Sequence, residues 1–230
     1  MKSVRHTISG TVLIAALLTI RPSPLLSYER ASYETKDAIA AGSSRPMPSS
    51  MGHAESVPSF VIPHDGSKIR FHVKASVAID GTFDKWDATL NFASTDPKSG
   101  VLKVEIQAAS VDTGSNMKDG KLKGKDFFDA KNNPLITFVS TGIVQNGSAT
   151  YDVPGQFTIR GVTKAETLHL AVSGQGTGSG EINGTMAFDR KDYGMNSGIP
   201  FVRIADRVEV DVNLKVNRVS GPPLAFIAGH

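Results

Sequence analysis

The sequence VEVDVNLKV at residues 208–216 alternates apolar and polar residues along its whole length. Val208, Val210, Val212, Leu214 and Val216 share one parity, and charged or amide side chains occupy the other. Successive side chains of an extended chain point to opposite faces. The pattern therefore predicts a β-strand with one face in a core and one in water, as in an antiparallel sheet.

The same alternation recurs upstream and predicts strands at 69–75, 88–92, 102–106, 168–172 and 186–188, to which we add 135–141 and 151–160. Turn signals at Asp96-Pro97, Asn146-Gly147 and Asn183-Gly184 separate them, so we expect about eight or nine strands. Helical character is confined to a short piece of the 115–130 loop. With no second set of apolar faces, the sheet must close into a barrel or pair with another sheet in a sandwich.

Five motifs follow one another in a fixed order: GTFDKW (81–86), SVDTG (110–114), KDGKLKGKDFFDAKNNPLITF (118–138), FTIRGVTK (157–164) and FDRKDYGM (188–195). In these motifs the chain resembles the YceI-like family, over roughly residues 57–218. The resemblance implies an all-β fold, a closed antiparallel lipocalin-like barrel of about eight strands that holds a polyisoprenoid chain. The chain departs from the family at Lys121, where members usually carry His, and at Tyr193, where they carry Phe.

The two ends of the chain differ in composition from the rest. Residues 1–27 combine a basic start, an apolar run from Ile8 to Ile20 and a Pro-containing end, which predicts a secretory signal of the Sec type and a periplasmic location. Residues 28–57 are rich in Ser, Ala, Glu, Arg and Pro and are expected to be a disordered spacer. Residues 58–218 then form the barrel domain, and 219–230 a flexible C-terminal tail.

Charge and cysteine content exclude several classes of function. Removing residues 1–27 lowers the formal net charge from +3 to 0, so no broad basic surface remains for a nucleic acid. The sequence has no cysteine, which excludes disulfides, zinc-thiolate sites and a cysteine nucleophile. The six histidines are scattered, and His72 and His169 fall on outward parities, so we expect neither a metal site nor a cofactor.

Three further patterns have competing interpretations. Asp189 and Asp192 flank Arg190 and could be an acid/base set, but a clamp in which Arg190 binds Asp189, Asp192 or Asp119 is favoured. The glycines of SGQGTGSG (173–180) lack phosphate-loop spacing and are interpreted as a hairpin connection. The five lysines between 118 and 131 are either a headgroup contact at the barrel mouth or a solvated loop.

Aromatic residues gather in the part of the chain that carries the motifs. Adjacent residues of an irregular segment usually face different ways, so one of Phe127 and Phe128 could fill the core while the other contacts ligand; the alternative is that both only pack. Inward aromatics and aliphatics either pack together or line a tunnel, and the sequence leaves both open. The candidate ligand-binding residues are Phe71, Val73, Phe83, Trp86, Phe92, Val104, Ile106, Lys121, Phe127, Phe128, Phe138, Phe157, Met186, Phe188 and Met195.

By the resemblance, the expected function is non-covalent carriage or sequestration of a long-chain isoprenoid or a quinone-type lipid. Transient membrane contact and a dimer stay open. Two alternatives remain from other classes: a structural or partner-binding module with a filled barrel, and an enzyme acting on a lipid headgroup through Asp119, Arg190 or Asp192.

Overall fold

The computed structural model describes residues 56–76, 78–198 and 203–226. The expected signal and nearly all of the expected spacer lie outside these residues. The described part consists of strands with one short α-helix, α1 (Asn116–Lys123), and three 3-10 turns. The strands are β1 (Ser59–Val61), β2 (Lys68–Ala75), β3 (Ile79–Phe83), β4 (Trp86–Phe92), β5 (Gly100–Gln107), β6 (Val111–Asp112), β7 (Leu135–Ser140), β8 (Val144–Gln145), β9 (Thr150–Ile159), β10 (Val162–Ser173), β11 (Ser179–Asp189) and β12 (Ile204–Ser220).

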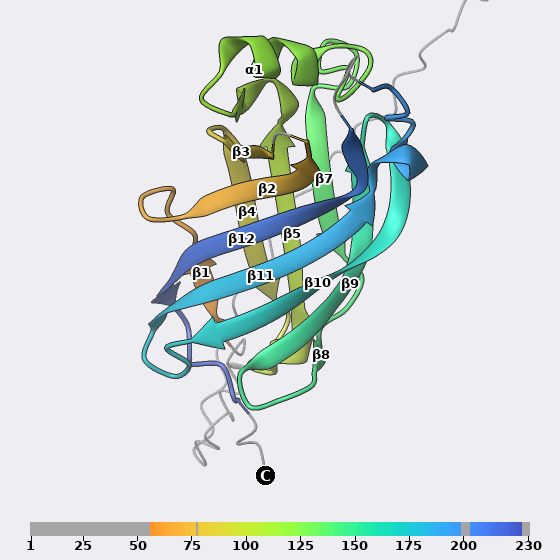
Figure 1. Cartoon of the computed structure of the whole chain (residues 1–230). Helices are drawn as coiled ribbons and strands as arrows, with labels where there is room; N and C mark the ends of the chain where they lie inside the picture. Colours follow the sequence, from red (N-terminus) through yellow and green to blue (C-terminus); the bar gives the residue numbers. More distant parts are fainter. Residues whose placement is uncertain (1–55, 77, 199–202, 227–230) are drawn as a thin grey trace, which may run out of the picture. The chain divides into compact units, whose positions relative to one another are not determined.

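The strands form a closed antiparallel barrel, which confirms the predicted fold (Figure 1). Its eight-stranded ring runs β1, β4, β5, β7, β9, β10, β11, β12 and returns to β1. The last strand closes it: β12 pairs along one edge with β11 and along the other with β2 and then β1. β3 and β6 extend the wall beyond β2.

The predicted alternation sets the inside and outside of the wall. On β5, Leu102, Val104 and Ile106 are buried, and the residues between them face outward. On β12, Val208, Val212, Leu214 and Val216 are buried. The outward parity of the two histidines is also confirmed, because His72 lies against Asp80 and His169 against Asp152 on the outer surface. The inward side chains form one core that fills much of the lumen.

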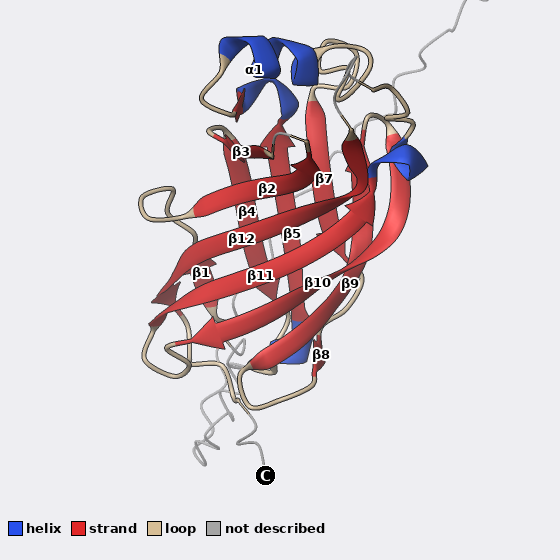
Figure 2. Cartoon of the chain, viewed as in Figure 1, coloured by secondary structure: helices blue, strands red, loops and turns tan. Residues whose placement is uncertain are grey.

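Helical segments lie at the ends of the barrel, not along its wall (Figure 2). α1 covers one end, which we call the α1 end. At the opposite end, the β10–β11 end, the chain turns between Ser173 and Ser179. Gly174, Gly176 and Gly178 take left-handed φ values of 72°, 79° and 88°, which glycine adopts without steric cost. The predicted hairpin connection is therefore confirmed.

One expected turn is wrong. Asn183-Gly184 lies in the middle of β11, where Asn183 pairs with Ala171 and Asn213. A Cβ at Gly184 would lie 2.8 Å from Leu170 Cδ2, so glycine lets Leu170 pack closely against β11. Residues 219 and 220, expected to begin the flexible tail, belong to β12.

Candidate functional site

The first candidate site is an apolar cavity of about 70 Å³ at the α1 end, the α1-end cavity. Its wall comes from β2, β3, β5, β7, β9, β11 and β12, and the segment after α1 covers it. Aromatic rings meet at close range, with Phe71 and Phe83 5.6 Å apart and Phe157 and Phe188 5.0 Å apart between centroids. Lining residues include Ile69, Phe71, Val73, Ile79, Phe83, Ile106, Leu122, Phe127, Phe128, Ile136, Phe157, Ile159, Phe188 and Met195.

The segment after α1 folds beneath the helix and turns both of its phenylalanines inward. The Phe128 N–H donates to the Leu122 carbonyl (2.9 Å), and Asp129 takes a left-handed φ of 49°. Phe127 and Phe128 are both buried and both line the α1-end cavity. The compact turn thus directs both rings to the same side, so the structure does not divide them into an inward and an outward residue.

The lysine-rich segment is partly neutralised by its own carboxylates. Lys121 Nζ lies 2.7 Å from Asp126 Oδ2 and 5.8 Å from the centroid of the Phe127 ring. The hydrogen bond and charge of Lys121 lower the pKa of Asp126. Lys121 is thus tied within the loop and does not line the α1-end cavity.

Arg190 is a clamp, as predicted, but its partners are not the predicted ones. The buried guanidinium donates to the carbonyl oxygens of Ala205 (3.0 Å) and Met195, and to Asp206 Oδ1 (3.2 Å). These bonds hold the loop after β11 against the start of β12. Lys191 and Arg190 lower the pKa of Asp206.

The three groups of the enzyme alternative have separate partners. Asp119 accepts hydrogen bonds from the Thr113 hydroxyl (2.7 Å) and N–H (2.9 Å), which lower its pKa despite its burial. Asp192 pairs with Lys164 at 3.4 Å. Asp119, Asp192 and Arg190 therefore each stabilise a different loop contact.

Tyr193 lies in the 3-10 turn Arg190–Tyr193 and packs against two phenylalanines that line the α1-end cavity. Its ring is fully buried against Phe157 and Phe188, at 5.5 and 5.2 Å between centroids. The hydroxyl donates to Glu166 Oε1 (2.9 Å) on β10. Burial and the acceptor Glu166 raise the pKa of Tyr193, so the phenol stays neutral.

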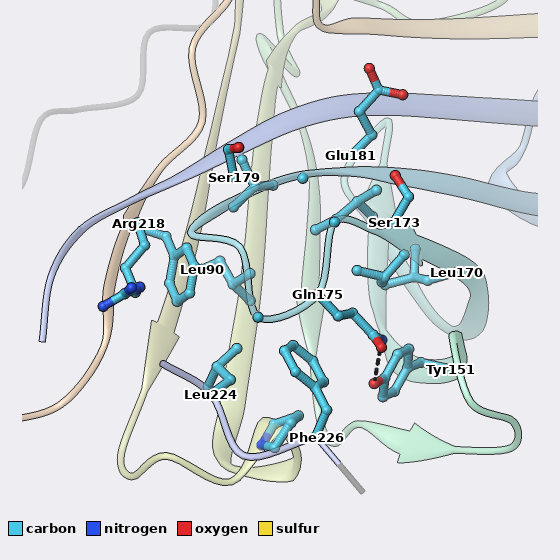
Figure 3. A pocket seen from close by; sticks show the side chains of 18 of the residues that line it. Leu90, Tyr151, Leu170, Ser173, Gln175, Ser179, Glu181, Arg218, Leu224 and Phe226 are labelled. Carbon is cyan, nitrogen blue, oxygen red and sulfur yellow. Dashed lines mark hydrogen bonds between the residues drawn. The ribbon is translucent and has the colours of Figure 1, made fainter. Parts of the chain in front are cut away.

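A second cavity of about 110 Å³ lies at the β10–β11 end, the β10–β11-end cavity (Figure 3). Gln175 Nε2 donates a hydrogen bond of 3.1 Å to the Tyr151 hydroxyl oxygen at this cavity, and the other polar lining residues are Ser173, Ser179, Glu181 and Arg218. Burial raises the pKa of Tyr151. Apolar lining residues include Phe60, Leu90, Phe92, Pro97, Leu102, Ile143, Val153, Leu170, Val172, Ile182, Val216, Leu224 and Phe226.

Side chains fill the barrel between the two cavities, in a region we call the waist. Val104 lies between Leu102, which lines one cavity, and Ile106, which lines the other. Met186 and Val212 occupy the equivalent middle positions on β11 and β12. The lumen therefore contains two separate apolar cavities, each smaller than the roughly 150 Å³ that holds one benzene ring and too small for a long chain with the waist side chains in this arrangement.

The structure distributes the predicted ligand-binding residues over these three regions. Nine line the α1-end cavity: Phe71, Val73, Phe83, Ile106, Phe127, Phe128, Phe157, Phe188 and Met195. Phe92 lines the β10–β11-end cavity. Trp86, Val104, Phe138 and Met186 are buried without lining either cavity.

Sequence reasoning missed most of the second cavity. The parity of Leu90, Leu170 and Val172 marks them as inward-facing and could have placed them in it. Leu224 and Phe226 carry no such signal, because they follow the last strand.

Comparison with known proteins identifies the barrel. A sequence profile of the YceI-like domain matches residues 60–216, which include the α1-end cavity, the waist and most of the lining of the β10–β11-end cavity. The chain belongs to the YceI-like family. A UPF0312 protein of Pseudomonas savastanoi pv. phaseolicola is 32% identical over 133 residues, 56% of this chain and 69% of the relative.

Solved structures share this YceI-like barrel. BcnA of Burkholderia cenocepacia is 30% identical with a TM-score of 0.61, over 67% of this chain and 98% of BcnA. The YCEI protein of Campylobacter jejuni is 25% identical with a TM-score of 0.52, over 62% of this chain and 86% of that protein. A polyisoprenoid binding domain from Saccharophagus degradans, 17% identical with a TM-score of 0.58 over 70% and 99% of the two chains, shares the fold.

Among residues 56–76, 78–198 and 203–226, there is no group of three His, Asp or Glu side chains placed to hold a metal ion. The helices in this part of the chain are too short or too polar to cross a bilayer.

Proposed function

We propose that this YceI-like barrel binds a long-chain isoprenoid or a related lipid, such as the tail of an isoprenoid quinone, without covalent chemistry. Carriage or sequestration of that lipid in the periplasm is the corresponding role. The observation that carries the proposal is the pair of cavities in one barrel, whose exposed lining is mainly apolar. The shared fold of the S. degradans polyisoprenoid binding domain supports it.

Tail burial would supply most of the affinity. Several hundred Å² of apolar tail, at about 25 cal/mol per Å², corresponds to roughly 10 kcal/mol. A lipid tail that occupies both cavities must pass the waist, so part of this binding energy goes into moving the side chains of the waist. Met186 at the waist is unbranched and flexible, which makes such movement inexpensive.

The lysine-rich segment suits the polar end of the ligand. Lys121 is already paired with Asp126, so of the other four lysines we take Lys118, Lys123 and Lys125 as the residues for a phosphate or other anionic headgroup. Exposed ion pairs contribute roughly 0 to 1 kcal/mol each, much less than the tail. The headgroup contacts would therefore set orientation and preference.

Mass spectrometry of solvent extracts from the purified, folded full chain tests the proposal. We expect a co-purifying isoprenoid, with less of it in Leu170→Trp, which adds bulk to the β10–β11-end cavity. Val139→Trp, on the outer face of β7, is the matched control and should keep the ligand. Protein that yields no lipid and binds no added isoprenoid would contradict the proposal and favour a structural module, for which the filled waist is the supporting observation.

A further inference from the structure

The chain does not leave the barrel when its last strand ends, but turns back across the cavity mouth. Gly221, directly after β12, has a left-handed φ of 78°. A Cβ at this position would lie 2.2 Å from the Val57 carbonyl oxygen, so only glycine fits the turn. The Arg218 guanidinium donates to the Gly221 carbonyl and fixes the direction in which residues 222–226 continue.

Residues 222–226, the C-terminal wall, pack against the β10–β11 end. Pro222 and Pro223 restrict the backbone to extended conformations. The Ala225 N–H then donates to the Thr95 carbonyl (2.8 Å), and Leu224 and Phe226 on either side line the cavity. Figure 3 shows both side chains pointing from the C-terminal wall toward the turn that carries Gln175.

The C-terminal wall borders the cavity but does not fill it. With Leu224 and Phe226 in place, about 110 Å³ remains between them and the side chains of β9, β10 and β11. A plug would instead fill the space that it closes. Segments held by few contacts can open without unfolding the strands beneath them, and this one follows the final strand.

The C-terminal wall also lies outside the part of the chain that defines the family. The YceI-like profile ends at residue 216, and the residues of the wall follow it. The cavity thus combines a lining from the shared barrel with two apolar side chains from an additional segment.

We propose that Leu224 and Phe226 are ligand-contacting residues that close the β10–β11 end around the apolar end of the bound lipid and slow its release. The inference rests on the proposed function, because it needs a lipid in the barrel. Opening of the C-terminal wall is then the step through which the lipid leaves at this end. Loss of the two side chains raises the dissociation rate more than the association rate.

Stopped-flow displacement on the full chain tests this. Protein is loaded with geranylgeraniol that carries a fluorescent anthraniloyl group, and an excess of unlabelled geranylgeraniol displaces it. The variants are the double substitution Leu224→Ser with Phe226→Ser, and a chain that ends at Gly221. Val219→Ser is the matched control, since Val219 is apolar, 58% exposed and not part of the cavity lining.

We expect the dissociation rate to rise about tenfold in both variants and to stay unchanged in the control, because two apolar contacts with the ligand are lost. An unchanged melting temperature would show that the barrel is intact. Equal dissociation rates in wild type and variants would overturn the proposal that Leu224 and Phe226 slow release. Tighter binding by the variants would also overturn it, because it would show that the segment competes with the lipid for the cavity. If wild-type protein binds no probe, both the proposed function and this inference are contradicted. If it binds the probe but the variants release it at the same rate, only this inference is contradicted.

Discussion

The Arg160 guanidinium donates a hydrogen bond of 2.7 Å to the Lys125 carbonyl and another to the Gly194 carbonyl. Arg160 has a left-handed φ of 56° in the turn between β9 and β10, and from there it ties together the two loops that cover the α1-end cavity. Arg160 therefore joins two parts of the cover over this cavity by binding backbone oxygens from distant parts of the chain.

Arg160→Met should loosen this cover. Losing charged hydrogen bonds to two carbonyls should lower the free energy of unfolding by about 1–3 kcal/mol. Amide hydrogen exchange should become faster in residues 124–130. Arg207→Met, which removes only an exposed contact with Glu209 at 3.4 Å, is the control and should leave exchange there unchanged. Equal exchange in both variants would leave Arg160 without a clamping role.

Gly155→Ala should destabilise the middle of the barrel. A Cβ at Gly155 would lie 2.5 Å from the tip of the Phe138 ring and 2.7 Å from the Val139 carbonyl oxygen, so side chain and backbone must both move. We expect a loss of about 1–3 kcal/mol in urea unfolding. Gly142→Ala is the matched control, because a Cβ there meets no atom within 4 Å. A neutral Gly155→Ala would show that Phe138 has free space around it.

Stability should fall at alkaline pH through Tyr193. Its pKa is raised in the folded state above the ordinary value of 10.0, because of burial and Glu166. The contribution is complete below the unfolded pKa and is lost as the pH rises from there through the folded pKa. Urea unfolding at about pH 8 and about pH 11 should show a larger loss for wild type than for Tyr193→Phe. Parallel losses would mean that Tyr193 does not contribute to the pH dependence.

The lysine-rich segment should affect headgroup preference more than total binding. Replacing Lys118, Lys123 and Lys125 together by Gln should weaken a polyprenyl phosphate roughly tenfold and leave the matching alcohol unchanged, because rim contacts contribute little beside the tail. The control variant has Gln in place of Lys68, Lys98 and Lys215, which gives the same change of charge elsewhere on the surface. Titration of both lipids against both variants measures the difference. Equal losses for phosphate and alcohol would make these lysines ordinary solvated side chains.

Bulk at the waist should block long ligands. Val104→Trp enlarges a waist residue, so it should reduce binding of a long isoprenoid at least tenfold, whereas Val139→Trp on the outer face of β7 should leave it unchanged. Overpacking should cost about 1–3 kcal/mol, which thermal unfolding can follow. Retained long-chain binding would show that the lipid does not pass the waist.

The barrel wall could be predicted from sequence because one face of each strand is buried and the other is wet. Residues 208–216 and 102–106 illustrate this, since their alternation alone separates inside from outside. The same reasoning failed at Asn183-Gly184, because glycine after asparagine indicates a turn but also suits a site with no room for a Cβ.

The candidate site was less predictable because its contacts depend on closure of the barrel. The partners of Arg190 are mostly backbone carbonyls, which no residue pattern reveals. Inward parity marks Ile106 and Val104 alike, yet one lines a cavity and the other fills the waist. The division of the lumen follows from side-chain volumes packed across the barrel, which alternation along a single strand does not encode.

The pairing of Ser59 with Ser220 has a consequence for how the molecule folds. This contact joins the first strand to the last, so the ring can close only after the whole domain is available. Contacts between residues so far apart in sequence form slowly, and we expect refolding in the slow range of β-proteins. Until then, β1 and β12 present unpaired edges that can bind another chain, so crowding during synthesis or refolding is the stage at which this protein is most exposed to aggregation.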